Sequence, residues 1–117
     1  MQRKSTEATE QQRIVQYCDT NGITMFAIPN GGKRDAKEAY FLKLSGVKAG
    51  VPDMFFAAAR HGWHGLFIEL KVGKNKLTKS QEKWLGDLRR LGYAAVMCVG
   101  YDEAIKIINW YYGGDFN

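Results

Sequence analysis

Three charged residues with the clearest chemical potential, Asp53, Glu69 and Lys71, lie within or beside apolar runs of the sequence. In a strand over 66–72, alternation places Glu69 and Lys71 on one face and leaves apolar side chains on the other: Leu66, Ile68, Leu70 and Val72. Burying such charges costs free energy unless they are paired or bind a metal. If the run 54–59 pairs with this strand around a turn at 60–65, Asp53 comes close to Glu69. The two carboxylates then offer an oxygen site for Mg²⁺ or Mn²⁺, with an amine beside it.

A simpler interpretation exists for each half of this pattern. A Glu-x-Lys on a strand is commonly the solvated face of a half-buried sheet, and Pro52-Asp53 alone is commonly a turn. Together, at a hairpin-sized spacing and between apolar runs, the two motifs favour a site.

Pro52-Asp53 followed by Glu69-Leu70-Lys71 resembles the signature of the PD-(D/E)xK nucleases. The wider set of motifs is similar to the VRR-NUC branch of that superfamily, from about Thr6 to Tyr112, and consists of Ile28-Pro29-Asn30-Gly31-Gly32, Gly50-Val51-Pro52-Asp53, Ile68-Glu69-Leu70-Lys71 and Ser80-Gln81. The resemblance implies a restriction-endonuclease-like core and a Mg²⁺- or Mn²⁺-dependent DNA endonuclease. It assigns metal ligation to Asp53, Glu69 and the backbone carbonyl of Leu70, action on the nucleophile to Lys71, and a place near the metal and the substrate to Gln81.

A first helix is predicted from Thr6, with Thr6 or Thr9 as its cap, to Asn21-Gly22. Glu7 and Glu10 lie three residues apart on one face of it. Acidic residues in a first turn ordinarily complement the helix dipole. The resemblance instead places one glutamate of this helix in the metal site; Glu7 matches best and Glu10 is the alternative.

Basic residues are predicted to contact DNA. Lys33 and Arg34 open a second predicted helix, which runs to about Leu44 with Ala36, Ala39, Tyr40 and Leu44 facing inward. Two cations at a helix N-terminus oppose its dipole, so a role beside phosphates competes with a merely solvated segment. The predicted DNA-binding set is Asn30, Lys33, Arg34, Lys74, Lys76 and Lys79.

The next helix is predicted to begin at Thr78. Thr78 and Gln81 fit a capping box, which is a complete structural account of Gln81 beside the catalytic one. An apolar stripe follows, with Gly92 as its C-cap: Trp84, Leu85, Leu88 and Leu91. A buried strand is expected over 94–99, and Asp102 is expected to cap a last helix.

The order of elements predicts one α/β domain over residues 1–117, a mixed sheet of about four strands with helices on both faces, after a frayed tail at 1–5. The net charge of +5 and the pI near 9.3 favour a polyanionic partner. Cys18 and Cys98 are interpreted as free thiols of a reducing compartment, and the cytoplasm of a bacterial or phage-infected cell is expected. His61 and His64 favour an exposed turn over a zinc site.

Three alternatives to a structure-selective endonuclease remain open: a non-enzymatic nucleic-acid-binding module, a nickase of broad specificity, and an RNA endonuclease on the same fold. The resemblance to stand-alone VRR-NUC proteins implies a homodimer that cleaves branched DNA such as four-way junctions. Aromatic residues near the C-terminus are expected at the dimer contact: Trp110, Tyr111, Tyr112 and Phe116.

Overall fold

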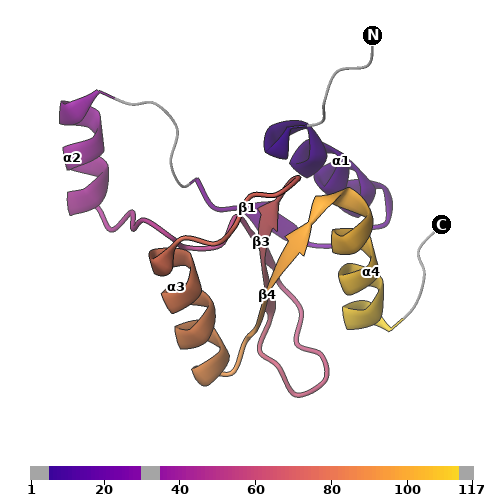
Figure 1. Cartoon of the computed structure of the whole chain (residues 1–117). Coiled ribbons are helices and arrows are strands. Elements are labelled where there is room, and N and C mark those ends of the chain that lie inside the picture. The colour runs from indigo at the N-terminus through magenta and orange to yellow at the C-terminus, as the bar shows by residue number, and fades with distance from the viewer. Residues whose placement is uncertain (1–5, 30–34, 114–117) are drawn as a thin grey trace, which may run out of the picture.

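A four-stranded mixed sheet forms the centre of the computed structural model, which describes residues 6–29 and 35–113 (Figure 1). The strands lie in the order β1 (Met25–Ala27), β2 (Met54–Phe56), β3 (Leu66–Lys71) and β4 (Ala94–Val99). β2 pairs antiparallel with both β1 and β3, whereas β4 pairs parallel with β3. The predicted hairpin is therefore confirmed. The predicted residues Asn30, Lys33, Arg34 and Phe116, and the tail at 1–5, lie outside the described residues.

Two of the strands are shorter than their apolar runs. The run 54–59 is a strand only as far as Phe56. Ala57 still donates a backbone hydrogen bond to Thr24, but the alanines, which have low strand propensity, do not continue the strand. β1 likewise covers only three residues of the predicted 23–28.

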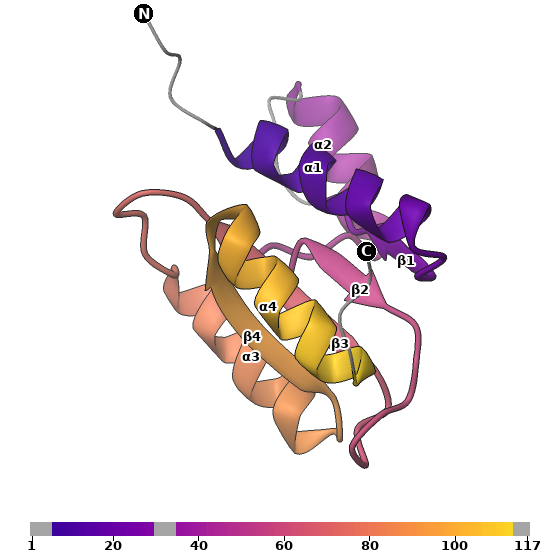
Figure 2. The same ribbon diagram turned by 90° about the vertical axis from the view of Figure 1, so that its right-hand side faces the viewer.

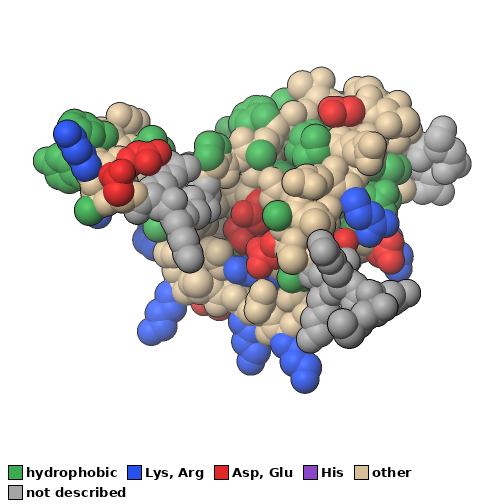
Figure 3. Space-filling model, turned by 90° about the horizontal axis from the view of Figure 1, so that it is seen from above, with side chains coloured by type: hydrophobic (Ala, Val, Ile, Leu, Met, Phe, Trp, Pro, Cys, Tyr) green, Lys and Arg blue, Asp and Glu red, His purple; other side chains and the backbone are tan. Residues whose placement is uncertain are grey.

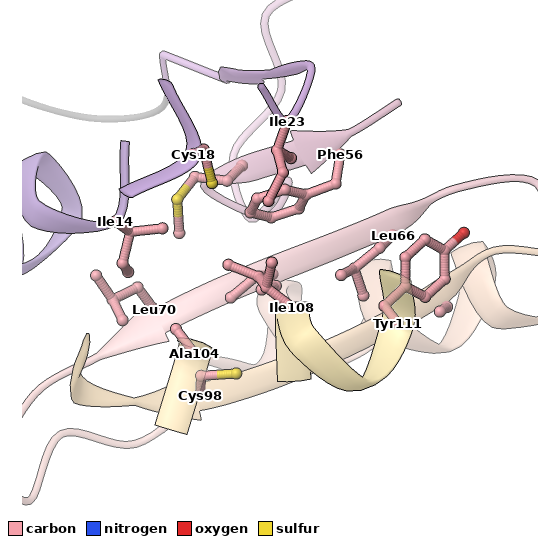
Figure 4. Packing of buried hydrophobic residues seen from close by; sticks show 13 residues of the cluster. Ile14, Cys18, Ile23, Phe56, Leu66, Leu70, Cys98, Ala104, Ile108 and Tyr111 are labelled. Carbon is pink, nitrogen blue, oxygen red and sulfur yellow. The ribbon is translucent and has the colours of Figure 1, made fainter. Parts of the chain in front are cut away.

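Helices cover both faces of the sheet, as predicted. α1 (Glu7–Thr20) and α4 (Gly100–Tyr112) pack together on one face, and α3 (Lys79–Arg90) connects β3 to β4 across the other (Figures 1 and 2). The larger core lies under α1 and α4, where Ile14 and Cys18 meet Ala104 and Ile108 (Figure 4). A smaller core lies under α3 and contains Leu85, Leu88 and Ala95. Leu91, predicted on this apolar stripe, is 67% exposed because the helix ends at Arg90 and Leu91 is its C-cap.

The helix caps follow the sequence at two helices and depart from it at a third. Thr6 caps α1 and forms a capping box with Thr9. The prediction that Asp102 caps α4 is wrong, because that helix begins at Gly100 and Asp102 lies within its first turn. The N-cap residue is Val99, whose apolar side chain makes no capping hydrogen bond. Instead Oε1 of Glu10, on α1, accepts a hydrogen bond from the backbone N–H of Tyr101 at 3.2 Å.

α2 (Ala36–Leu44) stands apart from the other helices and the sheet (Figure 1). Asp35 caps it, so the helix starts after Lys33 and Arg34. The inward orientation predicted for Ala36, Ala39, Tyr40 and Leu44 is wrong: no residue of α2, all of which the structure describes, is buried. A pattern of apolar residues shows that a helix has an apolar side, but it does not show which surface covers that side.

The C-terminal aromatic residues belong mostly to the core. Tyr111 is fully buried, and its hydroxyl donates a hydrogen bond to the Ala58 carbonyl at 2.6 Å. Tyr111 is therefore not free to form the predicted dimer contact, whereas Trp110 is 55% exposed. Cys18 and Cys98 are buried free thiols, and burial raises the pKa of each to about 12. Within the described part of the chain, none of the helices has the length and apolar character needed to cross a membrane.

Candidate metal centre

Carboxylate oxygens from three separate elements meet at one end of β3. Glu7 is the first residue of α1, Asp53 immediately precedes β2, and Glu69 lies in β3. One oxygen of each lies within 4.8 Å of the others. Seen from above, acidic side chains gather in a hollow in the middle of the molecule, with a basic side chain next to them (Figure 3).

Asp53 is held in place by the backbone of the neighbouring strand. Its Oδ2 accepts a hydrogen bond from the backbone N–H of Leu70 at 2.7 Å, and its carbonyl accepts one from Ile28 at 2.8 Å. The turn before it passes close to the start of α3. Gly50 has φ +90°, and a Cβ there would lie 2.8 Å from the backbone of Ser80, so only glycine fits.

Glu69 is 2% exposed although it carries a carboxyl group. Its Oε2 lies 3.8 Å from Nζ of Lys71 and accepts a hydrogen bond from Nε2 of Gln81 at 3.4 Å. Its Oε1 is buried and has no hydrogen-bond partner among the described residues. Burial raises the pKa of Glu69 to about 8, and the charge of Asp53 adds to this, while Lys71 acts in the opposite direction.

Lys71 is itself 8% exposed, so the second face of β3 is not a solvated surface. Glu69 and Lys71 lie on the side of the sheet that α3 covers, and Leu66, Ile68 and Leu70 lie in the main core. The alternative interpretation, in which Glu69 and Lys71 lie on the solvent-exposed face of a half-buried sheet, is wrong for this strand.

Gln81 takes part in the capping box and also contacts the acidic group, because the two contacts use different atoms of its amide. Oε1 accepts a hydrogen bond from the backbone N–H of Thr78 at 2.9 Å and completes the capping box of α3. Nε2 points the other way, to Glu69. The capping box thus fixes the orientation of an amide donor at the acidic group.

The structure separates the two candidate glutamates of α1. Glu7 belongs to the acidic group, and its Oε2 accepts a hydrogen bond from Nδ2 of Asn75 at 3.4 Å. Glu10 turns toward α4 and also forms an ion pair with Arg13. Sequence reasoning did not single out Asn75; its position between two lysines of the loop beside the site was the available signal.

The donor set fits a hard divalent cation. Three carboxylates supply only oxygen, which Mg²⁺ and Mn²⁺ prefer. A buried carboxylate oxygen without a partner is costly unless something compensates for it, and a cation would do so.

The remaining predicted residues lie around this centre. Lys74, Lys76 and Lys79 are exposed, in the loop after β3 and at the start of α3. The two histidines of the turn contact different elements: His61 contacts the carbonyls of Trp110 and Tyr111, and His64 packs against Tyr93. Neither belongs to the acidic group found among the described residues.

The sheet brings Asp53, Glu69 and Lys71 together beside Glu7, a set of oxygen ligands and an amine that suits metal-dependent hydrolysis. The model of the VRR-NUC domain matches residues 5–102, and the chain belongs to this family. A solved structure described as a VRR_NUC domain protein is similar to the whole molecule, with a TM-score of 0.83 and 30% sequence identity over 99% of this chain and 96% of that one. No curated protein matches the chain.

Proposed function

We propose that this member of the VRR-NUC nuclease family is a Mg²⁺- or Mn²⁺-dependent endodeoxyribonuclease that prefers branched DNA such as four-way junctions and works as a homodimer. The observation that supports the chemistry is the group of Glu7, Asp53 and Glu69, whose oxygens lie within 4.8 Å of one another beside Lys71.

Asp53, Glu69 and the carbonyl of Leu70 would hold the cation, and Glu7 would do so directly or through water. A bound divalent cation polarises a phosphate oxygen and lowers the pKa of a water molecule. Lys71 orients or deprotonates the attacking water and balances the negative charge that develops on the phosphate. Gln81 has an amide donor at the site and positions water or phosphate.

Three exposed lysines near the site, Lys74, Lys76 and Lys79, would contact phosphates, and Asn30, Lys33 and Arg34 complete the proposed DNA-binding set. Such contacts give affinity without reading the base sequence. The place of Lys74, Lys76 and Lys79 in the loop after β3 and at the start of α3 suits a nuclease that recognises the shape of its substrate.

The exposed apolar side of α2 favours a homodimer. Tyr40, Phe41 and Leu44 are each more than half exposed, and a nine-residue helix is marginal in water without tertiary packing. We place the dimer contact on this helix. A two-fold pair would hold two sites at a fixed separation, which suits the two strands cut at a junction.

The test is a panel of substrates incubated with and without Mn²⁺ or Mg²⁺: supercoiled plasmid, linear duplex, a four-way junction and structured RNA. We expect metal-dependent cleavage with the junction cut in paired strands. Binding without cleavage would favour the non-enzymatic module, nicking of every duplex the broad nickase, and cleavage of RNA alone the RNA endonuclease.

A further inference from the structure

Glu10 lies one helical turn after Glu7, outside the acidic group, and connects α1 to the start of α4. Its Oε1 accepts the hydrogen bond from the N–H of Tyr101, and its Oε2 lies 3.1 Å from Nη1 of Arg13. The guanidinium of Arg13 lies 4.0 Å from the centre of the Tyr101 ring. The three residues form one contact cluster between the two helices.

This cluster helps to hold the first two turns of α1 in position. The first buried residue of the helix is Ile14, so the described segment from Glu7 to Arg13 has no core residue to hold it. The Thr6–Thr9 capping box fixes the local conformation of the helix start, but both of its members belong to α1 itself. Within those two turns, Glu10 and Arg13 contact α4, and Glu7 accepts a longer hydrogen bond, at 3.4 Å, from Asn75 in the loop after β3.

The start of α4 is in turn fixed relative to the acidic centre. Lys71 pairs with Val99 in the parallel register of β3 and β4, and α4 begins at the next residue, Gly100. A continuous set of contacts therefore runs from Lys71 across to Val99, along the chain to Tyr101, through Glu10 and back one turn to Glu7.

We infer that Glu10 is a positioning residue: by accepting the Tyr101 N–H it holds the first turn of α1 where the Glu7 carboxylate meets Asp53 and Glu69. This inference rests on the proposed function, since it assumes that Glu7 contributes to binding a cation. Glu10 itself ligates nothing.

Two substitutions separate this role from a simple effect of charge. Glu10→Gln removes the charge but keeps an oxygen that reaches the Tyr101 N–H. Glu10→Asp keeps the charge, but its side chain is one methylene shorter and loses that reach. Mn²⁺ affinity, measured by calorimetry on the folded protein, should fall about tenfold in Glu10→Asp, at the low end of the range for groups that hold metal ligands in place, and stay within about threefold in Glu10→Gln.

The same pair is then compared in a Glu7→Ala background, where neither substitution should change Mn²⁺ affinity further, because the ligand that Glu10 positions is gone. Asp19→Asn, an exposed carboxylate change on the same helix, is the matched control and should leave the affinity unchanged. Hydrogen exchange at the Tyr101 amide should quicken in Glu10→Asp and stay near the wild-type rate in Glu10→Gln.

A weaker affinity in Glu10→Gln than in Glu10→Asp would show that the charge itself matters and would overturn the inference. Equal losses with and without Glu7 would overturn it too. If Glu7→Ala weakens Mn²⁺ binding and neither Glu10 substitution does, the inference fails and the proposed function stands. If the wild-type protein binds no Mn²⁺, both fail.

Discussion

In folded proteins charged side chains are ordinarily exposed and apolar side chains buried. β3 and α2 depart from this rule in opposite directions. β3 buries a carboxylate and an ammonium, whereas α2 leaves two aromatic rings and a leucine in contact with water. Glu69 and Lys71 are 2% and 8% exposed; Tyr40 and Leu44 are 60% and 65% exposed. Both arrangements cost free energy in the isolated chain.

The difference lies in what would compensate for each cost. On the charged face of β3, Glu69 has Lys71 and Gln81 as partners, and its Oε1 has no hydrogen-bond partner among the described residues. α2 packs extensively against none of the other described helices and strands. A small ion suffices for the first region, but the second needs a surface of protein size. Departures from local rules of this kind are expected where a protein binds something.

The largest expected effect is on cleavage. Asp53→Asn, Glu69→Gln and Lys71→Met should each lower the cleavage rate of the preferred DNA by at least about a thousandfold, as loss of a group at the reacting centre does. Thermal stability of Asp53→Asn and Glu69→Gln should hold or rise, because each change relieves repulsion between the two neighbouring carboxyl groups and Asn at 53 can still accept the Leu70 N–H.

Asp87→Asn is the control for this series, since Asp87 pairs with Lys83 and Arg90 on α3, away from the acidic group. Its rate should match the wild type in a titration with Mn²⁺. Near wild-type cleavage by any of the three site variants would remove that residue from the proposed mechanism, and the burial of its charge would then need another explanation.

The comparison of β3 with α2 also shows which features a sequence can predict. The hairpin, the caps of α1 and α3 and the meeting of Asp53 with Glu69 depend on strand alternation and on spacings of a few residues, and they were predictable. The orientation of α2, the cap of α4 and the burial of Tyr111 depend on contacts between distant segments. The Glu10 bond to Tyr101 spans 91 residues, and the Tyr111 bond to Ala58 spans 53. Periodicity gives no information about such pairs.

The second effect concerns association through α2. Light scattering at micromolar concentration should give about twice the chain mass of 13.2 kDa for the wild type. Phe41→Glu with Leu44→Glu should give the monomer mass, because charges replace the apolar contact, while Glu maintains the helix. Lys37→Gln, an exposed change on the same helix, should leave the dimer intact.

Two results would contradict this location. A double variant that remains dimeric would move the contact elsewhere, with Trp110 the first candidate because it is 55% exposed. A monomeric wild type that nicks linear duplex as readily as a junction would remove the homodimer from the proposal and leave α2 to another partner.

The smallest effect is on the pH dependence of stability, and it bears on β3 alone. The pKa of Glu69 is raised from 4.5 to about 8 in the folded metal-free protein, mainly by burial. The unfolded chain therefore releases this proton at lower pH than the folded one. Below about pH 4.5 both states hold the proton and the effect is absent; as pH rises toward 8 the unfolded state becomes progressively favoured, on the order of a few kcal/mol.

In the presence of a chelator, the melting temperature of the wild type should accordingly fall between pH 5 and pH 8 relative to that of Glu69→Gln, which cannot release this proton, by several degrees at roughly 4 °C per kcal/mol. Added Mg²⁺ should reverse the fall at pH 8, because a cation stabilises the ionised carboxylate of the folded protein and not that of the unfolded chain. Parallel curves for the two proteins without metal would mean that Glu69 is already ionised in the folded state. The buried charge of β3 would then be compensated within the molecule, by Lys71 and Gln81, and its burial would no longer be a reason to expect a cation there.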